Sequence, residues 1–406
     1  MAPKLIIQAG NMTGDMFGVA AALLLCKDYH VVLLSEGSKR DKTDSLRDFY
    51  VATLGGNRDR VHVLRNLQNI SESYTQYTAR ADTRQPLPYT DTEPPIPESL
   101  QDKNLQSPIS EATSAVAANW SKKRPDDIRK AWKSRSFDEQ IKRYLDKRGI
   151  PYKGGQSYAI LWSRFSGKKG GPHAQHDTSF EGMRQLVALA RKSKRIVLIV
   201  GDHNPSRSSE NKYKWLETMD KEGVFDLAEF WMTLDWKTVC PDDRMAQFAL
   251  FDFLHAQSNG NLKHLGFRSG NLEIYALLGH QVRYMEEIGN RETKRMLRWK
   301  KLGYELITVS KVPSKTGQWV VAENIKNKEK NNRHEAKPPW INDENKRKEE
   351  SIDPNATRGF NLEDLKKLEA YFQDPSSNDQ LIQNLADIQE YYAAAEQHDP
   401  WPRGQK

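Results

Sequence analysis

The segment His264–Glu287, which reads HLGFRSGNLEIYALLGHQVRYMEE, constrains the fold more than any other part of the sequence. Small residues at Gly266, Ser269 and Gly270 predict a bend where backbone N–H groups can approach a ligand. Apolar spacing over residues 272–278 predicts a helix behind that bend. The N-terminal, positive end of this helix would point at the bend, so the pattern favours a binding site there.

The same segment then turns into a strand. Gly279 is placed to end the helix as a left-handed cap residue, and Val282 and Tyr284 alternate with polar residues up to Glu286 and Glu287. Open α/β sheets bind ligands beyond the carboxyl ends of their strands. The segment therefore predicts an α/β fold with carboxylates at its ligand edge.

Bulk composition excludes few classes of protein. The 406 residues suffice for two or three domains of roughly 100–200 residues each. The 62 Lys and Arg exceed the 54 Asp and Glu, and the net charge of +8 is compatible with a polyanionic partner. Cys26 and Cys240 are the only cysteines, which argues against a disulfide framework or a cysteine zinc site and fits a reducing compartment.

No apolar run approaches the roughly 20 residues that a membrane span needs. The opening MAPKLIIQAG enters a predicted strand at once and lacks the apolar core of a signal peptide. We therefore expect no membrane partner and a cytoplasmic location.

The first predicted domain covers residues 1–150. Strands at 4–8 and 30–35 flank a helix at 16–27, and a helix at 45–54 and a strand at 60–64 continue the alternation. Six prolines and little periodicity predict that residues 71–110 form a surface excursion or lid. Residues 121–148 are charged and predicted to be helical, with Trp132 and Tyr144 facing inward.

A second α/β alternation predicts another domain over residues 151–320. Its strands are expected at 158–163, 195–200, 230–234 and 280–285, its helices at 179–191, 242–256 and 271–278, and a last hairpin within Lys301–Val320. Residues 321–406 are predicted to be a mobile charged linker followed by C-terminal helices. The expected fold is thus α/β, with two Rossmann-like domains facing a cleft and a C-terminal helical tail.

Each of the first two candidate sites directly follows the first strand of a predicted domain. The turn Gly10–Asp15 would bring Gly14 and Asp15 to the cleft, although Asp15 could equally serve as a helix cap. The loop Trp162–Asp177, WSRFSGKKGGPHAQHD, offers Arg164 for substrate binding and His176 for proton transfer. A solvated glycine loop is the plainer alternative. His173 and His176 lack a third ligand at a recognisable spacing, so no metal is expected.

The third and fourth candidates lie later in the chain. Asp202 and His203 follow the apolar strand RIVLIV, where a simple turn is the alternative. In the segment His264–Glu287, the candidate anion or hydroxyl binders are Arg268, Ser269 and Gly270, and the strand-end carboxylates are Glu286 and Glu287. Glu273 is a candidate catalytic carboxylate, but it could instead complement the helix dipole.

The fifth candidate is electrostatic. Ser121–Arg148 holds eleven Lys or Arg against five Asp or Glu, and Arg291–Lys301 adds a second basic patch. Such a face with nearby aromatic residues can follow an RNA backbone, although most charge runs are solvated surfaces. The residues predicted to bind tRNA are Arg129, Lys130, Lys133, Lys142 and Arg143.

Two resemblances connect these motifs. The stretch Ser269–Gly279, together with Gly14 and Asp15, resembles the nucleotide-sugar domain of glycosyltransferases with the GT-B fold, which has two Rossmann domains. The motifs WSRFSGKKGGPHAQHD, GDHNP and GFRSGNLEIYALLGHQVRYMEE look like the fungal arginine-containing cyclodipeptide synthases, over about residues 1–320.

The second resemblance implies an enzyme that joins arginine from arginyl-tRNA to a residue from a second aminoacyl-tRNA as a diketopiperazine, without a cofactor. Chemistry and position alone suggest Glu286 or Glu287 for the guanidinium and His176 or His203 as base. The alternatives are a nucleotide-sugar glycosyltransferase, in which Arg268 and Ser269 hold a diphosphate, and a non-catalytic RNA-binding protein using residues 121–148.

Overall fold

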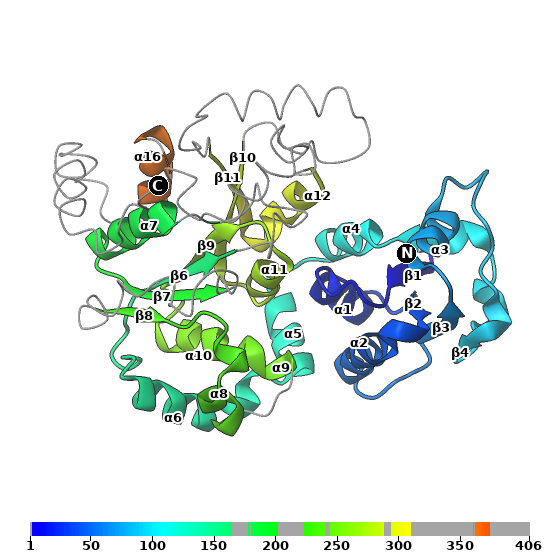
Figure 1. Cartoon of the computed structure of the whole chain (residues 1–406), viewed down its shortest axis with the longest axis horizontal. Coiled ribbons are helices and arrows are strands. Elements are labelled where there is room, and N and C mark those ends of the chain that lie inside the picture. The colour runs from blue at the N-terminus through cyan, green and yellow to red at the C-terminus, as the bar shows by residue number, and fades with distance from the viewer. Residues whose placement is uncertain are drawn as a thin grey trace, which may run out of the picture.

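A computed structural model of the chain has an α/β fold built on two sheets (Figure 1). It describes residues 2–164, 178, 180–201, 223–239, 244–287, 294–309, 360 and 362–373. Most of the predicted linker and C-terminal helices, residues 321–359 and 374–406, lies outside this part of the chain.

The first sheet has the strand order β4-β3-β2-β1-β5. Its centre is the parallel trio β1 (Lys4–Ala9), β2 (Tyr29–Glu36) and β3 (Val61–Leu67), linked by α1 (Met16–Leu25) and α2 (Arg40–Thr53). Continuous apolar runs form these strands because both faces of the sheet are covered. The predicted βαβ opening is confirmed.

Residues 71–110 pack onto this sheet, which differs from the expected surface excursion or lid. After α3 (Ile70–Thr78), β4 (Thr92–Glu93) adds an antiparallel edge to β3, and β5 (Gln106–Pro108) adds a parallel edge to β1. Leu87, Ile96 and Leu100 are buried in the same cluster as apolar residues of β1 and β2. These widely spaced side chains carry no period, so the sequence pattern concealed their burial.

The second sheet is parallel throughout, with the order β11-β10-β9-β6-β7-β8. The strands are β6 (Tyr158–Ser163), β7 (Ile196–Gly201), β8 (Val224–Asp226), β9 (Leu262–Phe267), β10 (Gln281–Glu287) and β11 (Tyr304–Val309). If these six strands are renumbered 1 to 6 in chain order and the sheet is read from β8, the order is 3-2-1-4-5-6, which is that of a doubly wound fold. The topological switch point lies between β6 and β9.

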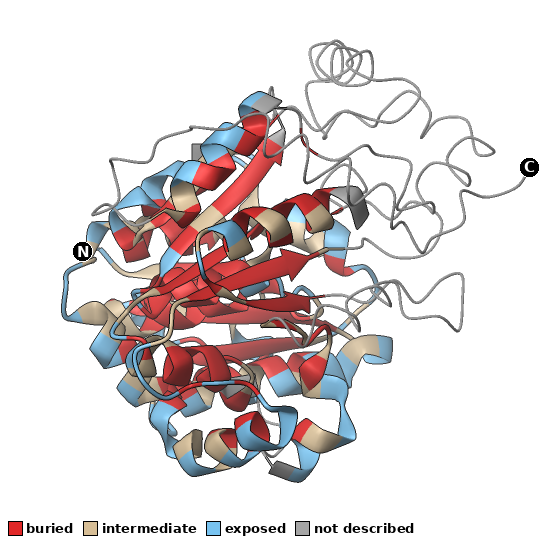
Figure 2. Cartoon of the chain, turned by 90° about the vertical axis from the view of Figure 1, so that its left-hand side faces the viewer, coloured by how far each residue is buried: buried red, intermediate tan, exposed pale blue. Residues whose placement is uncertain are grey.

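Helices cover both faces of the second sheet, and Figure 2 shows the buried strands between them. On one face, α7 (Phe180–Lys192) and α16 (Leu362–Phe372) bury Leu186, Leu365 and Leu368. The other face carries α9 (Arg244–Gln247), α10 (Ala249–Gln257) and α11 (Gly270–Leu277).

Two local predictions differ from the structure. Gly266, expected in the bend, lies within strand β9. Residues 230–234, expected as a strand, form the 3-10 turn η9 (Phe230–Met232) and the start of α8 (Leu234–Val239). Of the segment Lys301–Val320, predicted as a hairpin, the structure describes residues up to 309, and residues 310–320 lie outside the described part. Within it, β11 is parallel to β10 and is reached through α12 (Lys294–Leu297) and η11 (Arg298–Leu302). Short apolar runs do not distinguish a strand from a helical turn.

Three helices connect the sheets: α4 (Ser110–Ala118), α5 (Arg124–Trp132) and α6 (Asp138–Arg148). Contacts of α6 with α8 and α10 group this helix with the second sheet although it precedes residue 150, whereas α5 contacts both α2 and α11 and lies between the two halves. Short 3-10 turns complete the described elements: η1 (Gly37–Lys39), η2 (Tyr89–Asp91), η3 (Glu98–Leu100), η4 (Lys103–Leu105) and η5 (Ser134–Phe137).

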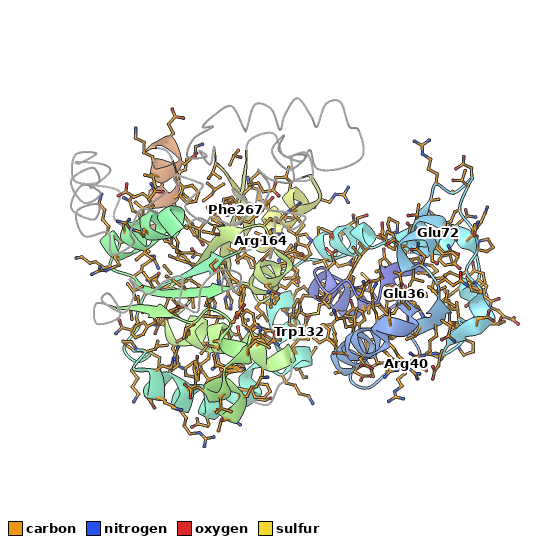
Figure 3. All side chains as sticks on the ribbon, in the orientation of Figure 1. Glu36, Arg40, Glu72, Trp132, Arg164 and Phe267 are labelled. Atoms are coloured by element: carbon orange, nitrogen blue, oxygen red, sulfur yellow. The ribbon has the colours of Figure 1, made fainter. Side chains whose placement is uncertain are left out.

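One hydrophobic cluster runs through both halves of the molecule. The Trp132 ring centroid lies 5.5 Å from that of Phe17 on α1 and 5.1 Å from that of Phe248, just before α10, and Figure 3 labels Trp132 at the junction. Tyr144 is likewise buried, so the inward positions predicted for both aromatic residues are confirmed. No helix among the described residues combines the length and apolarity of a membrane crossing.

Candidate functional site

The three sequence motifs all reach one edge of the second sheet. The first leaves the end of β6 at Ser163, the second begins at Gly201 where β7 ends, and the third runs through β9, α11 and β10. Since these strands are parallel neighbours, their carboxyl ends lie side by side. Of the predicted catalytic residues, His176, Asp202 and His203 lie outside the described residues, as does the side chain of Glu287.

Three predicted substrate-binding residues meet at the switch point of this sheet. The Arg164 guanidinium, after β6, donates to the backbone carbonyl of Arg268, after β9. Nε of Arg268 lies 2.8 Å from Oε1 of Glu286, whose side chain is 1% exposed. Arg164 and Phe267 mark the ends of the two central strands in Figure 3. The edge thus holds a buried arginine–carboxylate pair in the place where doubly wound sheets bind ligands.

Two tyrosines extend this cluster. The rings of Tyr284 on β10 and Tyr304 on β11 stack 4.4 Å apart at 12°, and each hydroxyl is buried without a hydrogen bond in the part of the chain that the structure describes. Burial, then the charge of Glu273, raises the pKa of Tyr304 well above its usual value. The sequence contained a signal for Tyr284, because the two-residue period of a strand places it on the face of Glu286.

Glu273 itself is buried in the first turn of α11. Burial and the charge of Glu286 raise the pKa of the nearby Tyr284, and Glu273 adds to that rise. A first-turn carboxylate also stabilises its helix through the macrodipole, so the structural alternative for Glu273 fits its position. Ser269 occupies the N-cap position of α11, and its side chain makes no capping hydrogen bond.

The first half of the molecule reaches the same helix through its N-terminal loop. A Cβ added at Gly270 would overlap the backbone carbonyl oxygen of Gly14, and α1 packs beside α11 (Figure 1). Asp15 stands at the N-cap position of α1 without a side-chain capping hydrogen bond. The loop after β1 and the bend after β9 are therefore in close contact.

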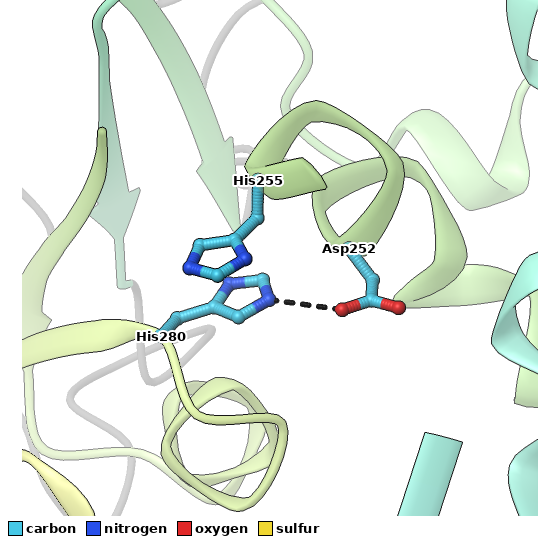
Figure 4. A group of neighbouring side chains, drawn as sticks. All are labelled: Asp252, His255 and His280. Atoms are coloured by element: carbon cyan, nitrogen blue, oxygen red, sulfur yellow. Dashed lines mark hydrogen bonds and ion pairs between the residues drawn. The ribbon is translucent and has the colours of Figure 1, made fainter. Parts of the chain in front are cut away.

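A buried histidine relay lies behind this edge, and no motif pointed to it. Nε1 of Trp162 is 3.2 Å from Nδ1 of His264, Nε2 of His264 is 3.0 Å from Nδ1 of His280, and Nε2 of His280 is 3.1 Å from Oδ1 of Asp252. The ring of His255 stacks on His280 at 4.0 Å (Figure 4). Asp252 and His255 are three residues apart on α10, which was the one local signal available.

The possible metal-ligand atoms of Asp252, His255 and His280 lie within 4.8 Å of one another. The two imidazole planes are 5° apart and stacked, so their in-plane lone pairs run parallel and do not converge on one ion. Nε of Arg129 lies 2.8 Å from Oδ1 of Asp252 and brings a positive charge to the carboxylate. The arrangement suits a hydrogen-bonded relay better than a cation.

Burial sets the protonation of the relay. It lowers the pKa of His264 well below its usual value, lowers that of His280, and lowers that of His255 to about 3. Burial alone would raise the pKa of Asp252, but its hydrogen bond with His280 and the charge and hydrogen bond of Arg129 lower it. At neutral pH, Asp252 and Arg129 therefore form the charged pair, and the three histidines are neutral.

The predicted tRNA-binding residues fall into different environments. Arg129 is held internally, because its guanidinium also donates to the Leu278 carbonyl. Nζ of Lys142 lies 2.5 Å from Oε1 of Glu139. Lys130, Lys133 and Arg143 are exposed. Trp132 and Tyr144 are buried, as their predicted inward positions require, so neither is available to stack on an RNA base.

A scan against protein-family models finds no match for this chain, and a search of curated proteins finds none. The functional interpretation therefore depends on the residues and their geometry.

The contact between the N-terminal loop and α11 makes Gly270→Ala destabilising. The added methyl group would meet backbone atoms of Gly14, which cannot rotate away, whereas the space around Gly14 is open. We expect Gly270→Ala to cost about 1–3 kcal/mol of unfolding free energy in urea titration, as overpacking does. Gly14→Ala is the matched control and should cost far less. Equal losses would contradict the close junction.

The histidine relay makes the protein acid-sensitive. The unfolded chain binds protons on histidine near pH 6.5, and the folded chain resists them, so the free energy of unfolding should fall as the pH drops below about 6.5. Each fully buried neutral histidine contributes up to about 1.4 kcal/mol per pH unit. Urea unfolding of His264→Phe between pH 7.5 and 5.5 should show a shallower decline than wild type. An unchanged slope would exclude His264 from this linkage.

Proposed function

We propose that the chain is a tRNA-dependent transferase that makes an arginine-containing cyclic dipeptide from arginyl-tRNA and a second aminoacyl-tRNA. The observation that carries this proposal is the convergence of the three motifs at one edge of the second sheet. The same three motifs carry the resemblance to the fungal arginine-containing cyclodipeptide synthases. Their meeting at a switch point supports a shared functional site.

The finer fold assignment belongs to this proposal. We take the two sheets as the cores of two Rossmann-like domains in a GT-B-like arrangement. The doubly wound order of the second sheet, the parallel β1-β2-β3 trio of the first, and the contact of Gly14 with Gly270 support it. In such an arrangement substrates lie where the strand ends of the two domains face each other.

The arginine side chain would be recognised at the buried cluster. A guanidinium has five N–H donors and no acceptor, so it needs carboxylate and hydroxyl oxygens around it. Glu286 already pairs with the guanidinium of Arg268, which supports this assignment because the same carboxylate geometry would suit a substrate guanidinium. A substrate guanidinium would compete with Arg268 for Glu286, and the hydroxyl oxygens of Tyr284 and Tyr304 would offer it further acceptors.

The reaction needs proton transfer and positioning. In the first step, the α-amine of one aminoacyl ester attacks the carbonyl of the other and expels a ribose hydroxyl of the second tRNA. In the second step, the free α-amine of the resulting dipeptidyl ester attacks the remaining ester carbonyl, which closes the ring and releases the first tRNA. Each amine must first lose a proton, for which His176, His203, Asp202 and Glu273 are the proposed groups. Because both esters are already activated, holding amine and carbonyl together supplies much of the rate.

The glycosyltransferase alternative requires a diphosphate at the start of α11. The carbonyl oxygen of Gly14 already lies against Gly270, and two electronegative groups would then crowd the same helix end. This contact favours the aminoacyl reaction, in which α11 contributes Glu273 and a closed wall to the site.

The direct test is to incubate the purified chain with arginyl-tRNA and a mixture of the other aminoacyl-tRNAs, and to search for cyclic dipeptides by mass. We expect arginine-containing products that disappear after RNase treatment of the substrates. Product formation without tRNA would reject the proposal. Stabilisation by a nucleoside diphosphate without product would favour a glycosyltransferase. Retention of tRNA with neither result would indicate a non-catalytic RNA-binding protein.

Tyr304→Phe tests the arginine site without breaking an existing hydrogen bond. Its hydroxyl is buried and unpartnered among the described residues, so its removal should leave the melting temperature unchanged or raise it. We expect about a tenfold loss of arginine incorporation, the worth of one hydrogen bond to a charged group. Tyr144→Phe is the matched control, because that hydroxyl is equally buried and unpartnered but lies on α6. Equal activity of the two variants would remove Tyr304 from substrate binding.

A further inference from the structure

A surface groove of about 700 Å³ lies where the first sheet's helices meet α5. Its apolar wall comes from Leu24 and Leu25 at the end of α1 and from Ala131 on α5. Ala52, Gly55 and Gly56, around the end of α2, form the opposite side. We call this feature the basic groove, because Arg124, Lys130 and Lys133 also line it.

The charges of the basic groove are unbalanced. Arg124 pairs with Asp127, which is the one acidic residue in the lining, and also donates to the Asn119 carbonyl. Lys130 and Lys133 are exposed and form no ion pair within the described residues. Two ammonium groups therefore stand beside an apolar wall without a carboxylate partner, which is the arrangement that a phosphate next to a flat base would match.

The C-terminal ends of α1 and α2, which lie beside the groove, are not expected to repel an anion. Around the end of α1, the Arg60 guanidinium donates to the carbonyls of Leu23, Cys26 and Lys27. The Gly55 and Gly56 amides bond to the carbonyls of Ala52 and Val51 at the end of α2. These donors offset the negative dipole ends that would otherwise repel a phosphate.

Lys133 occupies a backbone position that a lysine rarely adopts. It ends α5 with φ of 51° and ψ of 34°, in the left-handed region. The equivalent position at the end of α6 holds Gly149, which adopts this region at no steric cost. A lysine in this conformation costs conformational energy that a glycine would not, and Lys194 after α7 has a positive φ as well.

We propose that the basic groove holds one nucleotide of an RNA chain, with its base against Leu24, Leu25 and Ala131 and its phosphate between Lys130 and Lys133. This inference rests on the proposed function, for which the RNA is a tRNA. The groove lies at the C-terminal end of α1, whereas Gly14 and Asp15 precede its N-terminal end. The ten residues of α1 span about 15 Å, so the groove takes a nucleotide set back from the aminoacylated end.

The test measures binding of unacylated tRNA to the full chain by fluorescence anisotropy over a range of salt concentrations. Lys133→Gly should melt no lower than wild type yet bind tRNA several-fold more weakly, with a salt slope smaller by about one. Lys130→Ala should show the same loss. Ala52→Trp, which fills the groove and removes no charge, should also weaken binding.

Lys366→Ala combined with Lys367→Ala is the control, because it removes two exposed positive charges from α16, outside the groove lining. If this pair weakens binding as much as the groove variants, or if Ala52→Trp binds normally, the basic groove does not hold the nucleotide. Those results would leave the proposed function standing. A wild-type chain that forms no dipeptide and binds no tRNA would instead reject the proposed function itself.

Discussion

The buried carboxylate of Asp252 is the interaction on which the arrangement of the C-terminal half depends. Its two oxygens face Arg129 on α5 at 2.8 Å, Ser134 on η5 at 2.8 Å and His280 before β10 at 3.1 Å. One acidic group thus ties the connecting helices to α10 and to the strand that carries Glu286. Because a buried charge is stable only with all its partners in place, these elements are held as one unit.

The sequence predicted most of the α/β alternation because buried parallel strands are continuous apolar runs, as in YAILWS and RIVLIV. It predicted the packing of residues 71–110 poorly, because Leu87, Ile96 and Leu100 are spaced by turns and prolines that carry no period. The parallel pairing of β11 was also hidden, since its crossover through α12 and η11 lies in the basic run Arg291–Lys301, which reads as a charged surface.

At the candidate site, the position of a residue at a strand end predicted where it lies, but its side-chain chemistry did not predict its partner. Strand-end logic brought Arg164, Arg268 and Glu286 to one edge, but it could not show that Glu286 already holds Arg268. The histidine relay could not be predicted, because His264 lies on β9, His280 lies just before β10, and both meet Asp252 only through the fold. The same holds for Arg129, because a basic residue within a basic run does not indicate that its partner is the buried carboxylate of Asp252, 123 residues away.

Helix α1 connects the two regions that the proposals assign to the substrate. Its N-terminal loop touches the start of α11 at the strand-end site, and its last two residues line the basic groove. Eight of its ten residues are buried, and it packs against α2, α4 and α11, so it has little freedom to shift. The separation between site and groove is therefore set by the hydrophobic core. An RNA chain anchored in the groove would present its end at a constant distance from Glu286. A contact remote from the reacting ester could in this way position the ester for reaction.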